Sequence, residues 1–387
     1  MNFDLTPEQQ DLVSLVREIA KEKVAPLAAQ IDENEEIPAS LMTTLREAGI
    51  FGIGVPVEYG GAGMGTTGLV LAVEEVSRYC CATGLLLLLT RLPLAAILFA
   101  GTEAQKKKYA GGIADGSLRG AFCLSEPDAG SDSARITTKA VRKGDKYVIN
   151  GTKAWISGAA LADFFTVAVK TDTTAPGSKG MSVFVVEKGT PGLSIGKKEK
   201  KMGVRGLPVN QVIFEDCEVP AANLIGEENH GFKVIMKNLN SVRPIVASRG
   251  VGLASGALSY WVEFARQRMT FGKLIIEHQG LQWMMADLAS EIDAARLLTY
   301  RAARLVDEGK AGKETAHILS MAKFKATETA VRTANDCLQM MGAVGYMEDY
   351  PMARFVRDAR QLTIVEGTSQ IQKGIIARSI IDGDLKI

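Results

Sequence analysis

Apolar residues recur with a helical period in the first third of the chain, with a strand-like pattern in the middle, and with a helical period again after that. Over residues 9–120 the helical spacing is clear, for example at Leu12, Val16 and Ala20. Glycine and proline residues separate the successive stretches. We therefore expect a helical N-terminal domain over residues 1–120.

The pattern changes over residues 121–231, where short runs rich in β-branched and aromatic residues alternate with turn-forming clusters. The runs are Tyr147–Ile149, Phe164–Val169, Met181–Val186 and Val212–Phe214. Asn150–Gly151 is one of the predicted turns between them. Short strands at this spacing are typical of a small antiparallel barrel or sandwich.

A helical period returns over residues 232–387 and includes the stripe Leu281, Met284, Leu288 and Ile292. The chain therefore reads as an α+β multidomain protein, with a helical domain, a central antiparallel β-barrel-like domain and a second helical domain. A typical domain has about 150 residues, so a chain of 387 residues is long enough for two or three.

Composition narrows the class of function. A formal net charge of +1 gives no support to nucleic-acid or membrane binding as the main role. Five cysteines without a CxxC pair indicate a reducing compartment. Three widely separated histidines give little support to a metal site, and we expect none.

Neither of two candidate membrane or export signals is convincing. The first residues lack the basic start and apolar core of a signal peptide, and Thr6 with Pro7 and Gln9 instead has the pattern of a capped helix start. The most apolar stretch, 84–100, is interrupted by Arg91 and is too short to span a bilayer. It is predicted to form one buried helix or two.

A G-x-G-x-x-G string runs from Gly63 to Gly68. A dinucleotide-binding motif needs a strand before the string, a helix after it, and an acidic residue about 20 positions later. No Asp or Glu lies between Glu75 and Glu103. The string is therefore interpreted as a glycine turn between helices.

Two other stretches are better suited to chemistry. Residues 123–132, together with 153–157, place hydroxyls and backbone N–H groups at strand ends, where they could bind a polar ring or a phosphate; the alternative is an ordinary capped turn. Residues 364–370 place Glu366 between an apolar run and a helix start, where burial would raise its pKa; the alternative is a helix-capping acid.

Several motifs occur in one order along the chain: EYGGAG, SEPDAGSD, WIS, FEDCEVP, RQRMTFGK, QMMGAVGY and VEGTSQIQ. In this order and spacing the chain resembles the flavin-dependent acyl-CoA dehydrogenases, over essentially its whole length. The resemblance implies a helical domain, a β-barrel-like domain and a C-terminal four-helix bundle, usually assembled as a homotetramer.

The resemblance also implies the reaction, in which a proton leaves Cα and a hydride leaves Cβ of an acyl-CoA to give the 2-enoyl-CoA. Glu366 matches the family's catalytic base, and N5 of FAD accepts the hydride. Some relatives carry the base just before the residue matching Arg243, but here that position is Val242, which cannot act. The backbone N–H of Glu366 would help to bind the thioester oxygen.

Cofactor and substrate residues are carried over from the matching motifs. The residues implied to bind FAD are Leu124, Ser125, Trp155, Ser157, Arg268, Thr270, Phe271, Gln279, Gln339, Gly342, Thr368 and Gln370. Those at 268–279, 339 and 342 would hold the diphosphate and adenine half across a subunit interface. The residues implied to lie near substrate are Ser131, Arg243, Val365 and Gly367.

The chain departs from the family pattern at two places. Many relatives have Tyr where this chain has Val365, which leaves more room beside the reacting carbons. Arg91 lies in the apolar stretch that matches the wall of the acyl pocket. Because a buried unpaired charge is costly, Arg91 either turns outward or meets an internal carboxylate, or it binds a polar group at the far end of the substrate.

We expect an FAD-dependent dehydrogenase of a short or medium, branched, alicyclic or dicarboxylic acyl-CoA, with an electron-transferring flavoprotein as acceptor. The alternatives are an acyl-CoA oxidase, a decarboxylating dicarboxylyl-CoA dehydrogenase, or a DNA-binding relative, for which a basic surface is lacking. The expected location is the cytoplasm, or the mitochondrial matrix if the chain is a mature eukaryotic form.

Overall fold

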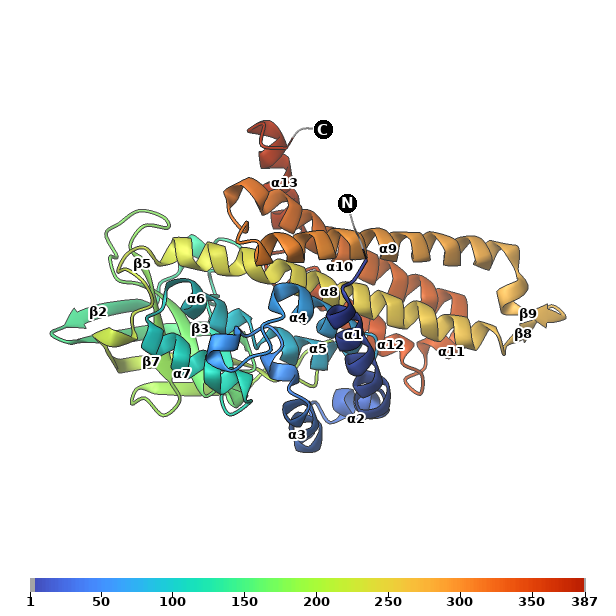
Figure 1. The fold of residues 1–387 in the computed structure, drawn as a ribbon, viewed down its shortest axis with the longest axis horizontal. Coiled ribbons are helices and arrows are strands. Elements are labelled where there is room, and N and C mark those ends of the chain that lie inside the picture. Colours follow the sequence, from blue (N-terminus) through green and yellow to red (C-terminus); the bar gives the residue numbers. More distant parts are fainter. Residues whose placement is uncertain (1–3, 386–387) are drawn as a thin grey trace.

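The computed structural model describes residues 4–385, so the outermost residues of the first and last predicted domains, 1–3 and 386–387, lie outside it. The predicted order is confirmed: a helical N-terminal region, a central curled sheet and a helical C-terminal region follow one another along the chain. Figure 1 shows the sheet at one end of the long axis and the β8–β9 hairpin at the other. The proposed boundaries at 120 and 231 fall where β1 and α8 begin.

The N-terminal region is built from seven helices and short helical turns within the described residues. The helices are α1 (Pro7–Ile19), α2 (Ala28–Glu33), α3 (Ala39–Glu47), α4 (Gly65–Ser77), α5 (Cys81–Leu88), α6 (Leu92–Ala100) and α7 (Glu103–Ala114). The capping box predicted at Thr6 is present, because its side chain accepts from the Gln9 N–H and the Gln9 side chain accepts from the Thr6 N–H. The glycine string lies in a turn after the 3-10 helix Val57–Tyr59 and runs into α4, as interpreted.

The apolar stretch forms the pair of helices α5 and α6, which meet at Thr90 and Arg91. By length and composition alone, Cys81–Ala100 would pass as a membrane span, with a mean hydropathy of 2.0. In the protein, however, 78% of that window is buried. Its apolar character therefore matches the interior of a folded protein.

The central sheet contains seven strands in the order β1-β4-β2-β3-β7-β6, with β5 paired to β4. The strands are β1 (Gly120–Cys123), β2 (Lys139–Lys143), β3 (Lys146–Ser157), β4 (Phe164–Lys170), β5 (Met181–Glu187), β6 (Leu193–Lys198) and β7 (Val209–Pro220). Most pairs are antiparallel, as predicted, but β4 pairs in parallel with β1 and, at one position, with β2. The β2–β3 hairpin lies between β1 and β4 in the chain and supplies the long crossover that a parallel pair needs.

The turn predicted at Asn150–Gly151 does not form, because both residues lie inside β3. The register with β7 shifts between Ile149 and Gly151, as at a β-bulge. Gly151 has φ +145, and a Cβ on it would lie 2.5 Å from Thr138 Oγ1. A glycine is needed here because the strand bulges and because Thr138 packs closely against this position. The Asn–Gly pair therefore does not mark a turn in this chain.

The C-terminal region contains three long helices and three shorter ones within residues 4–385. They are α8 (Gly231–Ala265), α9 (Gln279–Asp307), α10 (Ala316–Met341), α11 (Ala343–Tyr346), α12 (Met352–Leu362) and α13 (Ser369–Ile381), with the hairpin β8 (Met269–Thr270) and β9 (Lys273–Leu274) between α8 and α9. Figure 1 shows α8, α9 and α10 running along the long axis, while α13 projects from it. α8 packs against elements of all three regions, including α4, α10 and β5.

Polar contacts attach α4 to the C-terminal helices. Glu74 of α4 accepts from Arg296 at 2.8 Å and from Tyr300 at 3.0 Å, both on α9. At the end of α9, Asp307 accepts from the backbone N–H groups of Thr66 (2.6 Å) and Thr67 (2.9 Å). Asp307 thus satisfies two unpaired N–H groups at the start of α4, as a capping residue does, but from a distant part of the chain.

Replacing Asp307 with Ala should lower the free energy of unfolding by about 1–2 kcal/mol, the usual cost of losing a helix cap. Asp293→Ala is the matched control on the same helix, because its partner Arg296 keeps Glu74 and the pair is exposed. Urea unfolding of both variants would measure the difference. Equal losses in the two would show that Asp307 does not act as a cap.

Candidate active site

Glu366 lies in the short segment between α12 and α13, and its backbone is held in an unusual conformation. Its φ is +55, in the left-handed region, and the next residue, Gly367, has φ +93. The cap of α13 is Thr368, whose hydroxyl accepts from the Ile371 N–H at 3.3 Å. Because Thr368 provides the cap, the alternative of Glu366 as a helix-capping acid loses its support.

Two fully buried side chains hold the backbone at this segment. Lys323 of α10 donates to the Gly367 carbonyl at 2.9 Å. Gln372 of α13 donates to the same carbonyl at 3.1 Å and approaches the Glu366 carbonyl at 3.4 Å. These contacts fix the left-handed turn and therefore the direction of the Glu366 side chain.

The electrostatics of the segment suit an acid–base group. Burial raises the pKa of Glu366, while the positive charges of Lys323 and Arg249 oppose the increase. Burial lowers the pKa of Lys323 to about 8, against the opposing effect of the Glu366 carboxylate. A carboxylate whose pKa is shifted toward neutrality is a better match for proton transfer near pH 7.

The two polar stretches at strand ends, 123–132 and 153–157, lie side by side. The Ala154 N–H donates to the Ser125 carbonyl at 2.9 Å. Beneath them, the buried Lys153 ammonium contacts Glu126 Oε1 at 2.8 Å and the Leu124 carbonyl at 3.1 Å. An ion pair in the protein interior therefore joins the two stretches.

Hydrogen bonds complete the environment of Glu126. Its oxygens accept from the backbone N–H groups of Thr137 (2.6 Å) and Thr138 (2.9 Å). Burial by itself would raise the pKa of Glu126, but the Lys153 charge and these hydrogen bonds outweigh it and lower the pKa to about 2. Glu126 therefore stays ionised over the whole physiological range.

The surface formed by these stretches fits the flat, polar-edged ring of a flavin. Trp155 is 57% exposed, and its φ of +58 turns the backbone at this point of β3. Ser125 and Ser157 are partly exposed beside it, and Leu124 supplies an apolar contact. An exposed aromatic ring and an apolar side chain can pack on a heteroaromatic cofactor, and the two hydroxyls can hydrogen-bond with its polar edge.

A second group of predicted cofactor residues lies toward the end of the molecule opposite the sheet. Arg268, Thr270, Phe271 and Gln279 surround the β8–β9 hairpin, and Gln339 and Gly342 lie at the end of α10. Phe271 is 97% exposed and has φ +52, while His278 Nε2 contacts Thr270 Oγ1 at 3.1 Å. A single chain does not bring this group to the Trp155 surface, an arrangement suited to sharing across an interface.

The predicted substrate residues also occupy different surroundings. Ser131 is exposed in the loop after β1. Arg243 on α8 is 6% exposed and donates to Asn240 Oδ1 at 2.6 Å; burial lowers its pKa to about 10. Val365 and Gly367, on either side of Glu366, are both partly buried, and Gln370, a predicted FAD contact, is exposed.

Arg91 makes protein contacts of its own. Its Nη1 approaches the Gly54 carbonyl at 3.4 Å, and its guanidinium lies 5.9 Å from the centre of the Phe99 ring. Burial lowers the pKa of Arg91, and the charge of Asp307 opposes this. These contacts favour the structural alternative for Arg91; its contact with substrate stays a prediction.

The sequence pattern missed Lys323, although a signal was present. On α10, Leu319, Ala322 and Ala326 are buried, and helical spacing places Lys323 on the same face. A lysine within an apolar stripe is a buried charge that needs a partner. That partner is the backbone of the Glu366 segment, which lies 44 positions away in the sequence.

Comparison with known proteins gives one consistent result. The N-terminal, middle and C-terminal domains of the acyl-CoA dehydrogenase family match residues 6–117, 121–217 and 229–381. The chain is 43% identical to a cyclohex-1-ene-1-carbonyl-CoA dehydrogenase of Syntrophus aciditrophicus, covering 98% of this chain and 91% of the relative. It is also 43% identical to an acryloyl-CoA reductase (NADH) of Anaerotignum propionicum, covering 98% and 96%.

A solved structure described as the electron transferring flavoprotein of Acidaminococcus fermentans superposes with a TM-score of 0.95. Its matched chain is 41% identical and is covered completely, against 98% of this chain.

Lys153→Met should destabilise the protein by about 3–5 kcal/mol at pH 7, because Glu126 would stay buried without its counter-charge. The double variant Lys153→Met/Glu126→Gln is the control, and it should recover part of the loss. Denaturant unfolding would measure both. A single variant as stable as the wild type would mean that the ion pair does not join the two stretches.

The same pair predicts an acid dependence. The folded-state pKa of Glu126 is about 2, below the value near 4.3 of an unfolded glutamate. Its stabilising contribution is therefore complete above about pH 4.3 and is lost as the pH falls toward 2. The double variant should show a smaller loss of stability over this range than the wild type.

Proposed function

The chain belongs to the acyl-CoA dehydrogenase family, whose members are FAD-dependent oxidoreductases, and we propose that Glu366 is the base that removes the Cα proton of its acyl-CoA substrate. The observation that carries this proposal is the position of Glu366. It is a carboxylate with a raised pKa, held at a strained turn that buried side chains support. Strained backbone of this kind occurs preferentially at functional sites.

In the proposed reaction the chain removes the proton, and the hydride passes to FAD. Glu366 takes the α-proton onto a carboxylate oxygen, and its backbone N–H helps to stabilise the negative charge that develops on the thioester oxygen. Bound FAD supplies the acceptor for the hydride that leaves Cβ. The chain orients the acyl group and excludes water from the reacting carbons.

We assign the flavin ring to Leu124, Ser125, Trp155 and Ser157, with Thr368 and Gln370 as further contacts. The residues at the β8–β9 hairpin, with Gln339 and Gly342, would hold the diphosphate and adenine half of a cofactor bound mainly by a neighbouring subunit. The separation of the two groups within one chain supports this assignment. It requires a homo-oligomer, which we propose to be a tetramer.

For the substrate, Ser131 and Arg243 are assigned to the CoA portion, and Val365 and Gly367 to the region beside the reacting carbons. The relatives named above act on a cyclic acyl group and on the three-carbon acryloyl group. Those names support a compact acyl group. We propose a short or medium, branched, alicyclic or dicarboxylic acyl-CoA.

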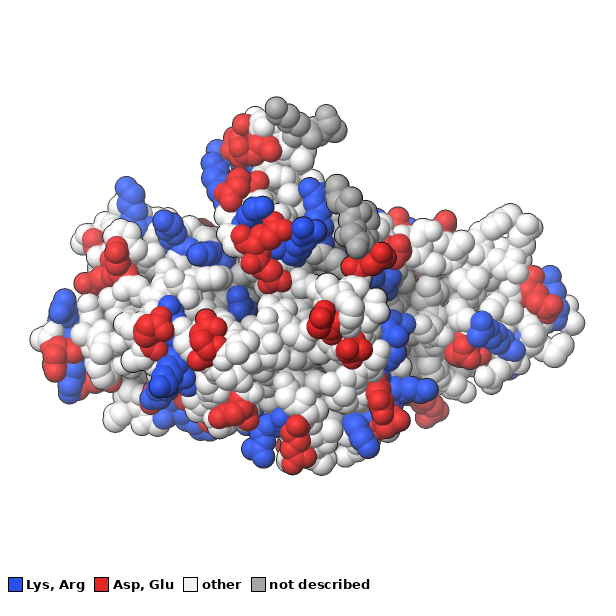
Figure 2. All heavy atoms as spheres, viewed as in Figure 1, with Lys and Arg blue, Asp and Glu red and all other residues white. Residues whose placement is uncertain are grey.

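An electron-transferring flavoprotein is the proposed electron acceptor, as the family resemblance implies, and the description of one matched solved structure names such a flavoprotein. Charged groups of both signs are interspersed over the face shown in Figure 2, which gives no support to a nucleic-acid surface there. The bacterial relatives support a cytoplasmic location.

Glu366→Gln should retain FAD and bind acyl-CoA, but flavin reduction by substrate should slow by at least about 10²-fold, since the amide cannot accept the proton. Stopped-flow bleaching of the flavin under anaerobic conditions measures the step. Asp358→Asn is the matched control, because burial also raises the pKa of Asp358, to about 6. Near-normal bleaching by Glu366→Gln would place the base elsewhere.

Arg268→Ala should weaken FAD retention about 10- to 100-fold, because a contact with a charged group contributes roughly 1.5–3 kcal/mol. Arg266→Ala is the control: Arg266 is two positions away and pairs with Glu263 at 2.9 Å on the surface. Equilibrium dialysis of both variants gives the affinities. Loss of flavin reduction at normal FAD affinity would contradict the assignment of Arg268.

A further inference from the structure

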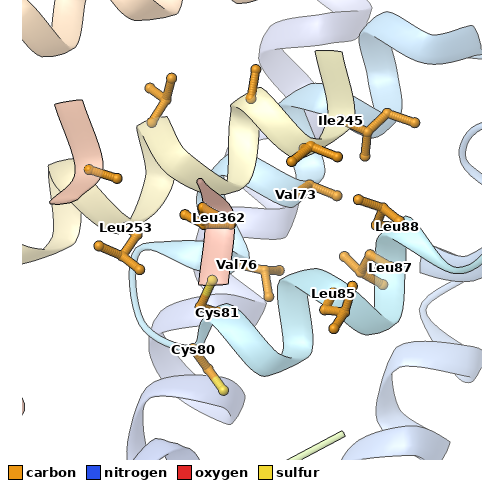
Figure 3. Close-up of a cluster of buried hydrophobic side chains, with 14 of the residues drawn as sticks. Val73, Val76, Cys80, Cys81, Leu85, Leu87, Leu88, Ile245, Leu253 and Leu362 are labelled. Carbon is orange, nitrogen blue, oxygen red and sulfur yellow. The ribbon is translucent and has the colours of Figure 1, made fainter. Parts of the chain in front are cut away.

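Arg249 occupies the middle of an apolar helix face. On α8 it lies four positions from both Ile245 and Leu253, so the three side chains project to the same side. Ile245 and Leu253 belong to the buried cluster in Figure 3, with side chains from α4, α5 and α12. Arg249 itself is 0% exposed.

The guanidinium of Arg249 has only neutral partners among residues 4–385. Its Nη2 donates to Gln361 Oε1 at 2.9 Å and lies 3.3 Å from both the carbonyl oxygen and Sγ of Cys81. Its Nε and Nη1 are buried and have no hydrogen-bond partner within the described chain. An arginine normally enters a protein interior with a carboxylate, so this one has unused donors and an unbalanced charge.

These unused donors lie close to the proposed base. Gln361 precedes Glu366 by five positions, and the charge of Arg249 acts on the pKa of Glu366. On its other side, Arg249 contacts α5 at Cys81, and its Cγ is 3.6 Å from the place where a Cβ on Gly84 would lie. Arg249 therefore lies between the base segment and α5.

Position along α8 separates Arg249 from the residue assigned to CoA. Arg243 precedes it by six positions, which is about 9 Å along a helix axis. In the proposed reaction the α-carbon of the acyl group lies beside Glu366, and the CoA portion lies at Arg243. A second cation farther along the same helix is therefore placed to meet the far end of a short acyl group.

We propose that Arg249 binds a carboxylate at the far end of the acyl group, so that the substrate is a short dicarboxylic acyl-CoA. This inference rests on the proposed function. A carboxylate fits because a guanidinium binds it through two parallel hydrogen bonds. The contacts point the same way, since Arg249 hydrogen-bonds only with Cys81 and Gln361 among the described residues and with no carboxylate there.

The test compares two substrates of the same shape that differ in charge. Glutaryl-CoA carries the distal carboxylate, and 5-methylhexanoyl-CoA replaces it with an isopropyl group of similar size. For the wild-type holoenzyme, kcat/KM from anaerobic flavin bleaching should be at least 10-fold higher for glutaryl-CoA. The expected effect of Arg249→Gln is a fall of this ratio by about 10- to 100-fold, the range for losing a charged hydrogen bond.

Two further variants make the result specific. Arg249→Lys keeps the charge but not the planar fork, so its ratio should lie between those of the wild type and Arg249→Gln. Arg91→Gln tests the other candidate partner of the carboxylate, since Arg91 is a partly buried arginine in the acyl-pocket stretch that contacts the Gly54 carbonyl. Its ratio should stay at the wild-type value. A fall in Arg91→Gln with none in Arg249→Gln would overturn the proposal and assign the carboxylate to Arg91.

Binding can be measured without turnover in the Glu366→Gln background, from the change in flavin absorption on adding each CoA ester. Arg249→Gln should weaken glutaryl-CoA binding selectively there. Equal losses for both esters would mean that Arg249 does not recognise the distal carboxylate and would overturn the proposal. If no acyl-CoA bleaches the wild-type flavin, the proposed function itself fails, which is a distinct result.

Discussion

The close packing of α8 between α4 and α10 is the constraint on which the other arrangements depend. All residues from Ser241 to Ala257 are buried, so this part of the helix is enclosed on every side. A Cβ on Gly252 would lie 2.2 Å from the Glu74 carbonyl oxygen of α4, and one on Gly250 would lie 2.8 Å from the Ala326 carbonyl oxygen of α10. Small residues at these points allow the backbones to approach, and larger ones would push α4 and α10 away from α8.

The enclosure of α8 determines the electrostatics of the site. A polar side chain on a helix enclosed from all sides cannot reach bulk water, so Arg243 and Arg249 must find partners inside the protein. The same holds for Lys323 on the facing surface of α10. Lys323 donates to the Gly367 carbonyl, and the charges of Lys323 and Arg249 both lower the pKa of Glu366 against the effect of burial. The packing of α8 therefore influences the pKa of the proposed base.

Much of the architecture could be predicted because hydrophobic period is a local property. The change from a helical to a strand-like pattern and back marked the three regions, and the Thr6 capping box was correct at the level of single hydrogen bonds. The prediction failed where distant segments decide the structure. Asn150–Gly151 is a strong turn signal that the pairing of β3 with β7 overrides, and the parallel β1–β4 pair joins residues 44 positions apart.

In the site, too, local motifs could be predicted from the sequence and contacts between distant segments could not. Glu366 and the flavin segments could be identified because they lie in short contiguous motifs. Arg249 was not singled out, because α8 is buried on every face from Ser241 to Ala257 and polar residues occur on several of its faces, so an arginine there does not stand out in the pattern. Nor does the sequence indicate that the nearest partner of Arg249 is the amide of Gln361, 112 positions later. Proximity of this kind arises only when α12 is docked against α8.

The α5–α6 pair has a consequence for how the chain is made. Cys81–Ala100 is apolar enough to enter a bilayer, yet one of the helices that covers it, α8, begins only at Gly231. At a synthesis rate of about 5–20 residues per second, the interval between the two is on the order of ten seconds. During that time the apolar segment Cys81–Ala100 is made but α8, which packs against it in the folded protein, is not. Apolar surface exposed in this way favours aggregation of the nascent chain until α8 has been made and has packed against α5 and α6.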